Sequence, residues 1–205
     1  MTLTFPMQDC VRQSHSKAEV LDISNLIKNR KSAVRFADRR LKPKEIETLI
    51  EAACHAPSSR NEQPWRFVIA RSGTADFDAF IGIMAPSNQA WAQTADVLVL
   101  ACYVDVFSSD GLANRTAIYD LGAAVAFLAL QAEFMDLSAH QIGGFDIKKA
   151  KPLLPENPHL QPCVIVAIGE AETIDRLNEA EIQKASRNRI RNSVSDVCLS
   201  LRAFN

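Results

Sequence analysis

Three apolar segments constrain the fold of this chain more than any other feature. Val97–Val104 (VLVLACYV) and Cys163–Ile168 (CVIVAI) are short, continuous apolar runs, the pattern of strands that are buried on both faces of a sheet. Ala117–Met135 is longer, rich in alanine and apolar nearly all round, so we predict that it forms the central buried helix. We expect the 205 residues to form a single domain around these segments.

The residues before the first apolar run predict further helices. A first helix ends at Asn29, with Ser16 or Asp22 as its N-cap, and a second begins at Pro43 and ends before Pro57. The other predicted elements are a strand over Phe67–Ala70 and a helix over Asp76–Met84. Helices outnumber strands and are interleaved with them, so this order predicts an α+β fold of mixed α/β layers.

Composition excludes several classes of site. Only 7 glycines are present, and no G-x-G-x-x-G, Walker-type or G-x-S-x-G motif can be written with them. The formal net charge is -1 and the basic clusters lack interleaved aromatic residues, so we expect no nucleic-acid partner. The four histidines show no metal-binding spacing, so we expect no metal site.

The cysteines and the N-terminus indicate a cytoplasmic protein. Five cysteines, an odd number with no C-x-x-C pair, are typical of reduced thiols. Residues 1–15 are expected to form a loose arm without the pattern of a signal peptide. The longest apolar stretch, Leu121–Leu130, is about ten residues and a bilayer needs about 20, so we expect no membrane partner.

Two basic clusters are candidates for phosphate binding. Arg30-Lys31-Ser32 places two cations and a hydroxyl beside a helix end, although charge runs of this kind are usually solvated surface. The cluster of Arg187, Arg189 and Arg191 is either a second phosphate clamp or a solubilising feature of the tail.

Two loops are candidates for contact with a planar ligand. Ala56–Phe67 (APSSRNEQPWRF) offers hydroxyl, amide and backbone groups between two prolines, or is only a helix-to-strand connection. Ser138–Asp146 (SAHQIGGFD) contains Gly143 and Gly144, which let a backbone come close to a ligand or simply make a turn. His140, in the same segment, is interpreted as a core or interface histidine.

Together these segments resemble the nitroreductase family of FMN-dependent NAD(P)H oxidoreductases. APSSRNEQPWRF is similar to the family's A-P-S-S-x-N-x-Q-P-W-x-F loop. Tyr119–Asp146 resembles the family's central helix and the glycine loop after it, and Pro162–Gly169 resembles the strand that follows. Arg30-Lys31-Ser32 before Phe36 is similar to the arginine–basic–serine signature, and the resemblance covers about residues 22 to 191.

The resemblance implies a nitroreductase-like fold, with a central mixed β-sheet flanked by helices, and a homodimer that holds FMN at the subunit interface. The tail, residues 170–205, would wrap around the partner subunit. The implied cofactor contacts are Arg30, Lys31 and Ser32 at the phosphate and ribityl end; Pro57, Ser58, Ser59 and Asn61 along the isoalloxazine, partly from the second subunit; Gln141, Ile142, Gly143 and Gly144 near flavin N5; and Arg187 and Arg189 completing the phosphate clamp.

The chain departs from the family pattern at one basic position. The family often has a basic residue two places before the phenylalanine, where this chain has Val34, and Arg35 comes one residue later. Either the register shifts by one and Arg35 supplies this contact beside the N1 edge of the flavin, or no residue fills the position.

The implied activity is hydride transfer from NADH or NADPH to flavin N5, and then to a small aromatic or conjugated acceptor such as a nitroaromatic, a quinone or an enone. The sequence does not select the nicotinamide or the acceptor. A backbone N–H of Gly143 or Gly144 would be the catalytic donor at N5, so we expect Gly144→Val to prevent flavin binding. The alternatives are a non-reductive or dehalogenating member of the same fold and a flavin-free binding protein.

Overall fold

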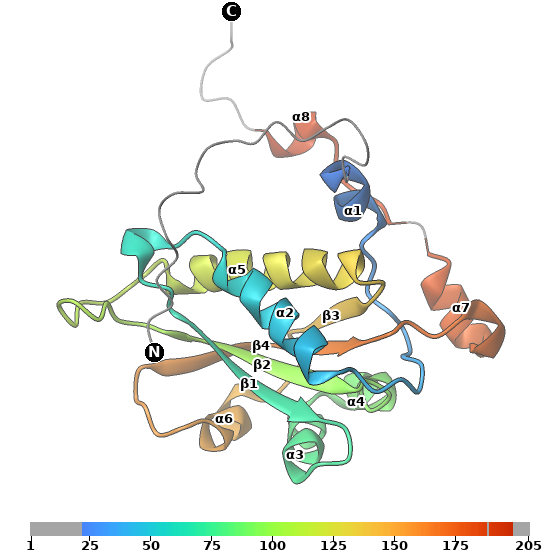
Figure 1. Cartoon of the computed structure of the whole chain (residues 1–205), viewed down its shortest axis with the longest axis horizontal. Coiled ribbons are helices and arrows are strands. Elements are labelled where there is room, and N and C mark those ends of the chain that lie inside the picture. The colour runs from blue at the N-terminus through green and yellow to red at the C-terminus, as the bar shows by residue number, and fades with distance from the viewer. Residues whose placement is uncertain (1–21, 188, 199–205) are drawn as a thin grey trace, which may run out of the picture.

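The central element is a four-stranded antiparallel sheet. The computed structural model describes residues 22–187 and 189–198. Its strands are β1 (Trp65–Arg71), β2 (Val97–Val104), β3 (Ser138–Ile142) and β4 (Leu160–Gly169), in the order β1-β2-β4-β3 (Figure 1). β2 and β4 lie in the middle, and the apolar runs of the sequence predicted both of them.

The predicted α+β fold of helices around a central sheet is confirmed, but the sheet described here is not mixed. All three strand pairings are antiparallel. The physical reason is visible at β1 and β2, where Arg71 and Val97 are cross-strand partners. The chain thus leaves the sheet and re-enters it at the same end, which makes neighbouring strands run in opposite directions.

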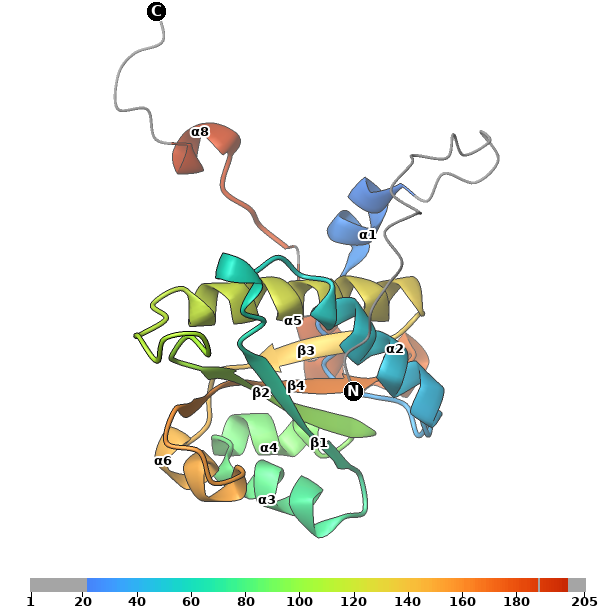
Figure 2. The ribbon, with the colours of Figure 1, turned by 60° about the vertical axis from the view of Figure 1, so that its left-hand side comes forward.

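Helices cover both faces of this sheet. α2 (Pro43–Cys54) and α5 (Ala117–Phe134) pack together on one face, whereas α3 (Ala75–Ile83), α4 (Pro86–Ala92) and α6 (Ile147–Ala150) cover the other (Figure 2). The buried apolar residues accordingly form two clusters, one on each side. Burial on both faces explains why β2 and β4 are almost continuously apolar.

α5 is the core helix on the face of the sheet that it covers together with α2. Among the described residues, α5 is the one helix that is long and apolar enough to cross a membrane by length and composition alone. The apolar stretch considered in the sequence, Leu121–Leu130, covers only part of it. In the structure its inner side packs against α2 and the strands, as a core helix does. Its buried residues are Ala117, Asp120, Leu121, Ala124, Val125, Leu128, Ala129 and Ala132.

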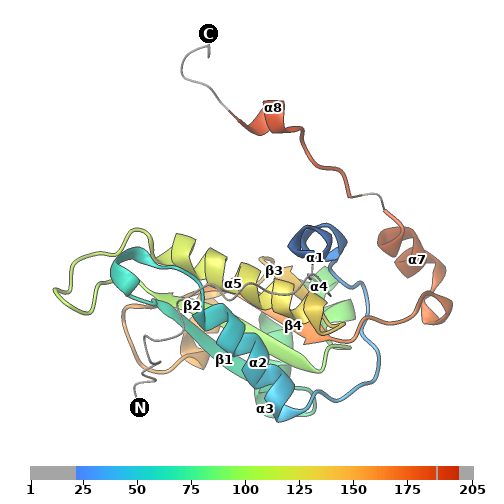
Figure 3. The ribbon, with the colours of Figure 1, turned by 45° about the horizontal axis from the view of Figure 1, so that its top comes forward.

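Smaller elements lie outside the layers. α1 (Ile23–Asn29) begins at Asp22, whose side chain accepts a hydrogen bond from the Ser24 N–H at 2.9 Å, while the alternative cap Ser16 and the arm 1–15 lie outside the described residues. The tail carries α7 (Glu179–Ala185) and α8 (Val194–Val197), and α8 stands away from the sheet and its covering helices (Figure 3). The short 3-10 turns are η2 (Ser59–Asn61), η3 (Lys151–Leu153) and η4 (Ile174–Arg176).

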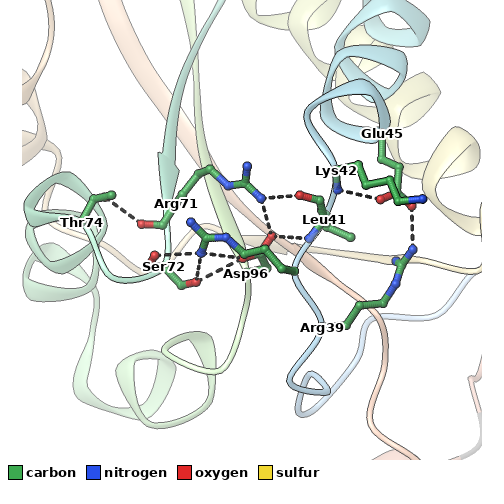
Figure 4. A network of polar contacts seen from close by, with 9 residues as sticks. Arg39, Leu41, Lys42, Glu45, Arg71, Ser72, Thr74 and Asp96 are labelled. Atoms are coloured by element: carbon green, nitrogen blue, oxygen red, sulfur yellow. Dashed lines mark hydrogen bonds and ion pairs between the residues drawn. The ribbon is translucent and has the colours of Figure 1, made fainter.

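A buried carboxylate fastens the segment before α2 to the sheet (Figure 4). Asp96, at the start of β2, accepts hydrogen bonds from the Leu41 N–H at 2.8 Å, from Arg40 at 3.0 Å and from Arg71 at 3.2 Å. Arg71 also donates to the Leu41 carbonyl. Because the carboxylate has several donors, its burial is compensated, and Asp96 is best explained as a structural residue.

Candidate functional site

The basic segment after α1 borders an open cavity. Arg30 is the C-cap of α1, and Lys31 and Ser32 follow it with exposed side chains. The cavity has a volume of about 380 Å³. Its lining includes Lys31, Ser32, Val34, Arg35, Glu133 and Ser138. Lys31, Arg35 and the Ser32 hydroxyl are donors that suit an anion such as a phosphate, although Glu133, Asp136 and Glu172 also line the cavity and offset the positive charge.

The tail arginines are placed differently from each other. Arg189 donates to the Arg30 carbonyl at 2.5 Å, to the Ile27 carbonyl at 3.3 Å and to the Lys28 carbonyl, so its guanidinium caps the end of α1. Partial burial and then the nearby Arg189 lower the pKa of Arg30. Arg187 is exposed at the end of α7, where its backbone N–H bonds the Lys184 carbonyl. The structure therefore brings Arg189 to the basic segment, 159 residues away in the chain.

Arg35 lines the same cavity as Ser32, although Val34 occupies the basic position of the family pattern. One Arg35 guanidinium nitrogen lies 3.8 Å from a carboxylate oxygen of Glu181 in α7. The Nε atom of Arg35 is buried without a hydrogen-bond partner. A buried donor without a partner is costly, which makes Arg35 suited to an acceptor from a bound group.

Gly143 and Gly144 follow β3 directly, and Gln141 and Ile142 are the last residues of that strand. The Gly144 carbonyl accepts hydrogen bonds from the Ala85 N–H at 2.9 Å and from Asn88 at 3.1 Å. A Cβ atom at Gly144 would lie 2.7 Å from the Asn88 side-chain nitrogen, but one at Gly143 would meet no atom within 4 Å. Of the two, Gly143 is therefore the one with open space around an added Cβ, as also at Gly73, Gly82, Gly111 and Gly122.

The loop Ala56–Phe67, called the APSS turn below, contacts the start of α5. Arg60, Asn61 and Gln63 have left-handed backbone angles, with φ of 53°, 54° and 50°. The Gln63 N–H donates to the Ser58 hydroxyl at 3.0 Å. The Ser59 N–H donates to Asp120 at 3.1 Å, and this buried carboxylate lies in the first turn of α5. Pro57, near the start of this turn, is exposed.

The two groups of predicted site residues lie at opposite ends of α5 in one chain. The APSS turn contacts the first turn of the helix, whereas the cavity beside Ser32 is lined by Glu133 and Asp136 at its other end. Figure 1 shows η2 at the N-terminal end of α5 and α1 above its C-terminal end. An 18-residue helix is about 27 Å long, so a single copy does not bring the two groups together.

The sequence reasoning missed some residues that organise this region. Ser138 and His140 belong to β3, which was interpreted as part of a ligand loop, and both contact the segment Lys31–Ala33. The partly polar composition of Ser138–Ile142 concealed an edge strand. Asp120 was also missed, although an acidic residue in the first turn of an apolar helix is a usable signal.

Comparisons with known proteins show the family to which the chain belongs. The family model described as "Nitroreductase family" matches residues 27–170. An uncharacterised 15.4 kDa protein of Mycolicibacterium smegmatis is 30% identical over 147 residues, 66% of this chain and 95% of that protein. An Archaeoglobus fulgidus protein, named for NADH dehydrogenase/NAD(P)H nitroreductase activity, is 41% identical over 46 residues, 22% of this chain and 26% of its own length. A crystal structure described as an oxidoreductase containing FMN has a TM-score of 0.80 and 28% identity, covering 94% of this chain and 96% of that one.

Proposed function

Because the chain belongs to the nitroreductase family, we propose that it is an FMN-dependent oxidoreductase. When bound, FMN would accept a hydride from NADH or NADPH and reduce a small aromatic or conjugated acceptor. Support comes from the similar crystal structure, which contains FMN, and from the name of the Archaeoglobus relative, which includes NAD(P)H. The four free cysteines among the described residues support a cytoplasmic location.

The observation that carries this proposal is the arrangement along β3. The cavity lined by Lys31, Ser32 and Arg35 lies at Ser138, where β3 begins. Gly143, where an added Cβ would meet no atom, comes directly after the last residue of β3. At about 3.4 Å per residue, Ser138 and Gly143 are about 17 Å apart. An elongated cofactor with a phosphate at one end and a planar ring at the other suits these two features.

We assign the roles of the residues as follows. Lys31, Ser32 and Arg35 would bind the phosphate or the ribityl arm, while Arg30 and Arg189 add positive charge and hold the end of α1. A backbone N–H of Gly143 or Gly144 would donate to flavin N5, with Gln141 and Ile142 leading to it. Losing one preorganised donor at a reacting atom costs about 3 kcal/mol of the activation barrier.

The proposed homodimer follows from the distance between the two groups of site residues. Pro57, Ser58, Ser59 and Asn61 would contact the flavin held by Ser32 and Gly143 of a second copy. Most of the large apolar side chains that are exposed among the described residues support such a contact, because they lie on α1, α5 and the end of the tail: Ile23, Ile27, Ile118, Tyr119, Phe127, Phe134, Ile190, Val194 and Val197. The others, Ile69, Leu112, Ile147 and Ile174, are scattered over other elements.

The residues between β2 and α5 are the candidates for contact with the acceptor. Phe107 is buried beneath the Arg60 guanidinium, which lies 4.2 Å from its ring centre and pairs with Asp110. Ile118 and Tyr119 are exposed at the start of α5, and Arg115 lies beside them. The exposed apolar side chains of Ile118 and Tyr119 beside these charged groups suit a small aromatic or conjugated acceptor such as a nitroaromatic, a quinone or an enone.

The absorbance spectrum of the purified protein tests this proposal. We expect a flavin spectrum that NADH or NADPH bleaches and that a suitable acceptor restores. A colourless protein that takes up no added FMN would contradict the enzyme proposal and favour a flavin-free binding protein. A flavin spectrum that neither nicotinamide bleaches would instead favour a non-reductive or dehalogenating member of the fold.

A further inference from the structure

The segment that carries Ser32 is held against β3 by two side chains outside the predicted site. The Ser138 hydroxyl accepts a hydrogen bond from the Ala33 N–H at 2.9 Å and donates one to the Lys31 carbonyl at 3.1 Å. Nδ1 of His140 lies 2.7 Å from the Ala33 carbonyl oxygen. Because a carbonyl only accepts, Nδ1 carries the hydrogen in this bond.

Both side chains are themselves fixed. Ser138 is buried, with 6% of its surface exposed, and it uses its hydroxyl both as donor and as acceptor. The His140 ring stacks on Trp91, with 4.1 Å between ring centroids and 17° between ring planes. Burial lowers the pKa of His140, the hydrogen bond to the Ala33 carbonyl partly opposes this, and the positive charge of Arg30 lowers it again, so the net shift is downward.

The three hydrogen bonds flank Ser32 and leave it free. They fix Lys31 on one side and Ala33 on the other, while the Ser32 side chain stays exposed at the cavity. A donor held in place before binding loses less conformational entropy when the ligand arrives.

We propose that Ser138 and His140 are positioning residues that preorganise Lys31–Ala33 for the phosphate of the cofactor. This inference rests on the proposed function. It predicts that the two residues affect FMN, which has the phosphate, much more than riboflavin, which lacks it.

The test measures the dissociation constants of FMN and riboflavin with the apoprotein by flavin fluorescence. Wild type is expected to bind FMN more tightly. Ser138→Ala and His140→Phe, which keeps a ring against Trp91 but has no donor, should each weaken FMN binding about tenfold and leave riboflavin binding within about twofold. His140→Asn, which keeps a donor near the Nδ1 position, should restore most of the FMN preference.

Two controls separate positioning from general loss of structure. Val99→Ala in the buried centre of β2 should lower the free energy of unfolding and leave the FMN-to-riboflavin ratio unchanged. In a Ser32→Ala background, Ser138→Ala should reduce FMN affinity much less than it does alone, because it acts through Ser32.

Several outcomes overturn the inference. An unchanged ratio in both Ser138→Ala and His140→Phe would show that the segment needs no such support, and an equal loss of both flavins would show a structural effect only. A wild-type protein that binds neither flavin overturns the proposed function itself. If the wild type prefers FMN to riboflavin and the variants prefer it to the same degree, only the positioning role is refuted.

Discussion

At the scale of single residues, the adjacent glycines Gly143 and Gly144 differ in what surrounds them. Neither has a positive φ, so neither is required by its backbone angle. A side chain at Gly144 would displace the Asn88 amide, which donates to the Gly144 carbonyl, whereas one at Gly143 would meet open space. The expected effect of Gly144→Val therefore combines a clash inside the protein with any effect on a ligand, and Gly143 is the cleaner position to change.

We expect Gly143→Val to leave the apoprotein folded and to abolish FMN binding, because the added side chain fills the space proposed for the cofactor. The melting temperature of the apoprotein should change by only a few degrees, and the flavin bound per chain should fall below a tenth of the wild-type value. Gly144→Val serves as the comparison, since it should also lower the melting temperature. Stoichiometric FMN in purified Gly143→Val would refute the placement of the cofactor.

At the scale of elements, α1 depends on contacts from outside itself. It has seven residues and none of its side chains is buried, so it is too short to be stable alone. Asp22 caps its first turn, and Arg189 binds the carbonyls of its last turn. A tail residue thus stabilises the helix that leads into Arg30-Lys31-Ser32.

Arg189→Ala should make α1 fray, because the carbonyls of its last turn lose a charged donor worth about 1.5 kcal/mol. Amide hydrogen exchange in Ile23–Asn29 should become about tenfold faster, and FMN affinity should fall. Arg187→Ala is the matched control for the exchange rates alone: it removes an exposed tail arginine two residues away that makes no contact with α1 among the interactions described. Equal exchange rates in wild type and Arg189→Ala would show that the cap does not stabilise α1.

At the scale of the whole molecule, α5 both builds the core and separates the two halves of the candidate site. Its inner side is buried against α2 and the sheet, while Tyr119 and Phe127 remain exposed on the outside. The APSS turn and the Ser32 cavity lie at its two ends. In the proposed homodimer, one copy would carry two half-sites, and a second copy placed along α5 would complete both.

Phe127→Glu should dissociate the proposed homodimer, since it places an unpaired carboxylate in an apolar contact at a cost of about 3 kcal/mol or more. By sedimentation, the dimer dissociation constant should rise more than about 100-fold, and FMN should be lost with the dimer. Ile147→Glu changes an equally exposed apolar residue on α6, over the other face of the sheet, and should leave both unchanged. A Phe127→Glu protein that stays dimeric with bound FMN would exclude α5 from the interface.

Local patterns in the sequence were sufficient for most elements and for the family. Continuous apolar runs predicted β2 with the bounds observed and the core of β4, and helical spacing predicted α2, α3 and α5 to within one to three residues. These predictions succeeded because burial leaves a local pattern in the sequence. A strand that is buried on both faces is continuously apolar, and a helix that is buried on one side is apolar at helical spacing. The helices α4, α6, α7 and α8 and the strand β3 were missed, because they are short and their partly polar sequences carry little periodic signal.

The sequence by itself determined the longer elements, the two-sided core and the motifs of the nitroreductase family. Only the tertiary structure decided which distant residues meet. Arg189 caps α1, and Ser138 and His140 hold Lys31–Ala33. The APSS turn meets Asp120 and lies a helix length from the Ser32 cavity. The reason is physical. Helix and strand periods are properties of neighbouring residues, whereas these contacts join residues more than 60 positions apart and exist only once β3 and α5 have packed.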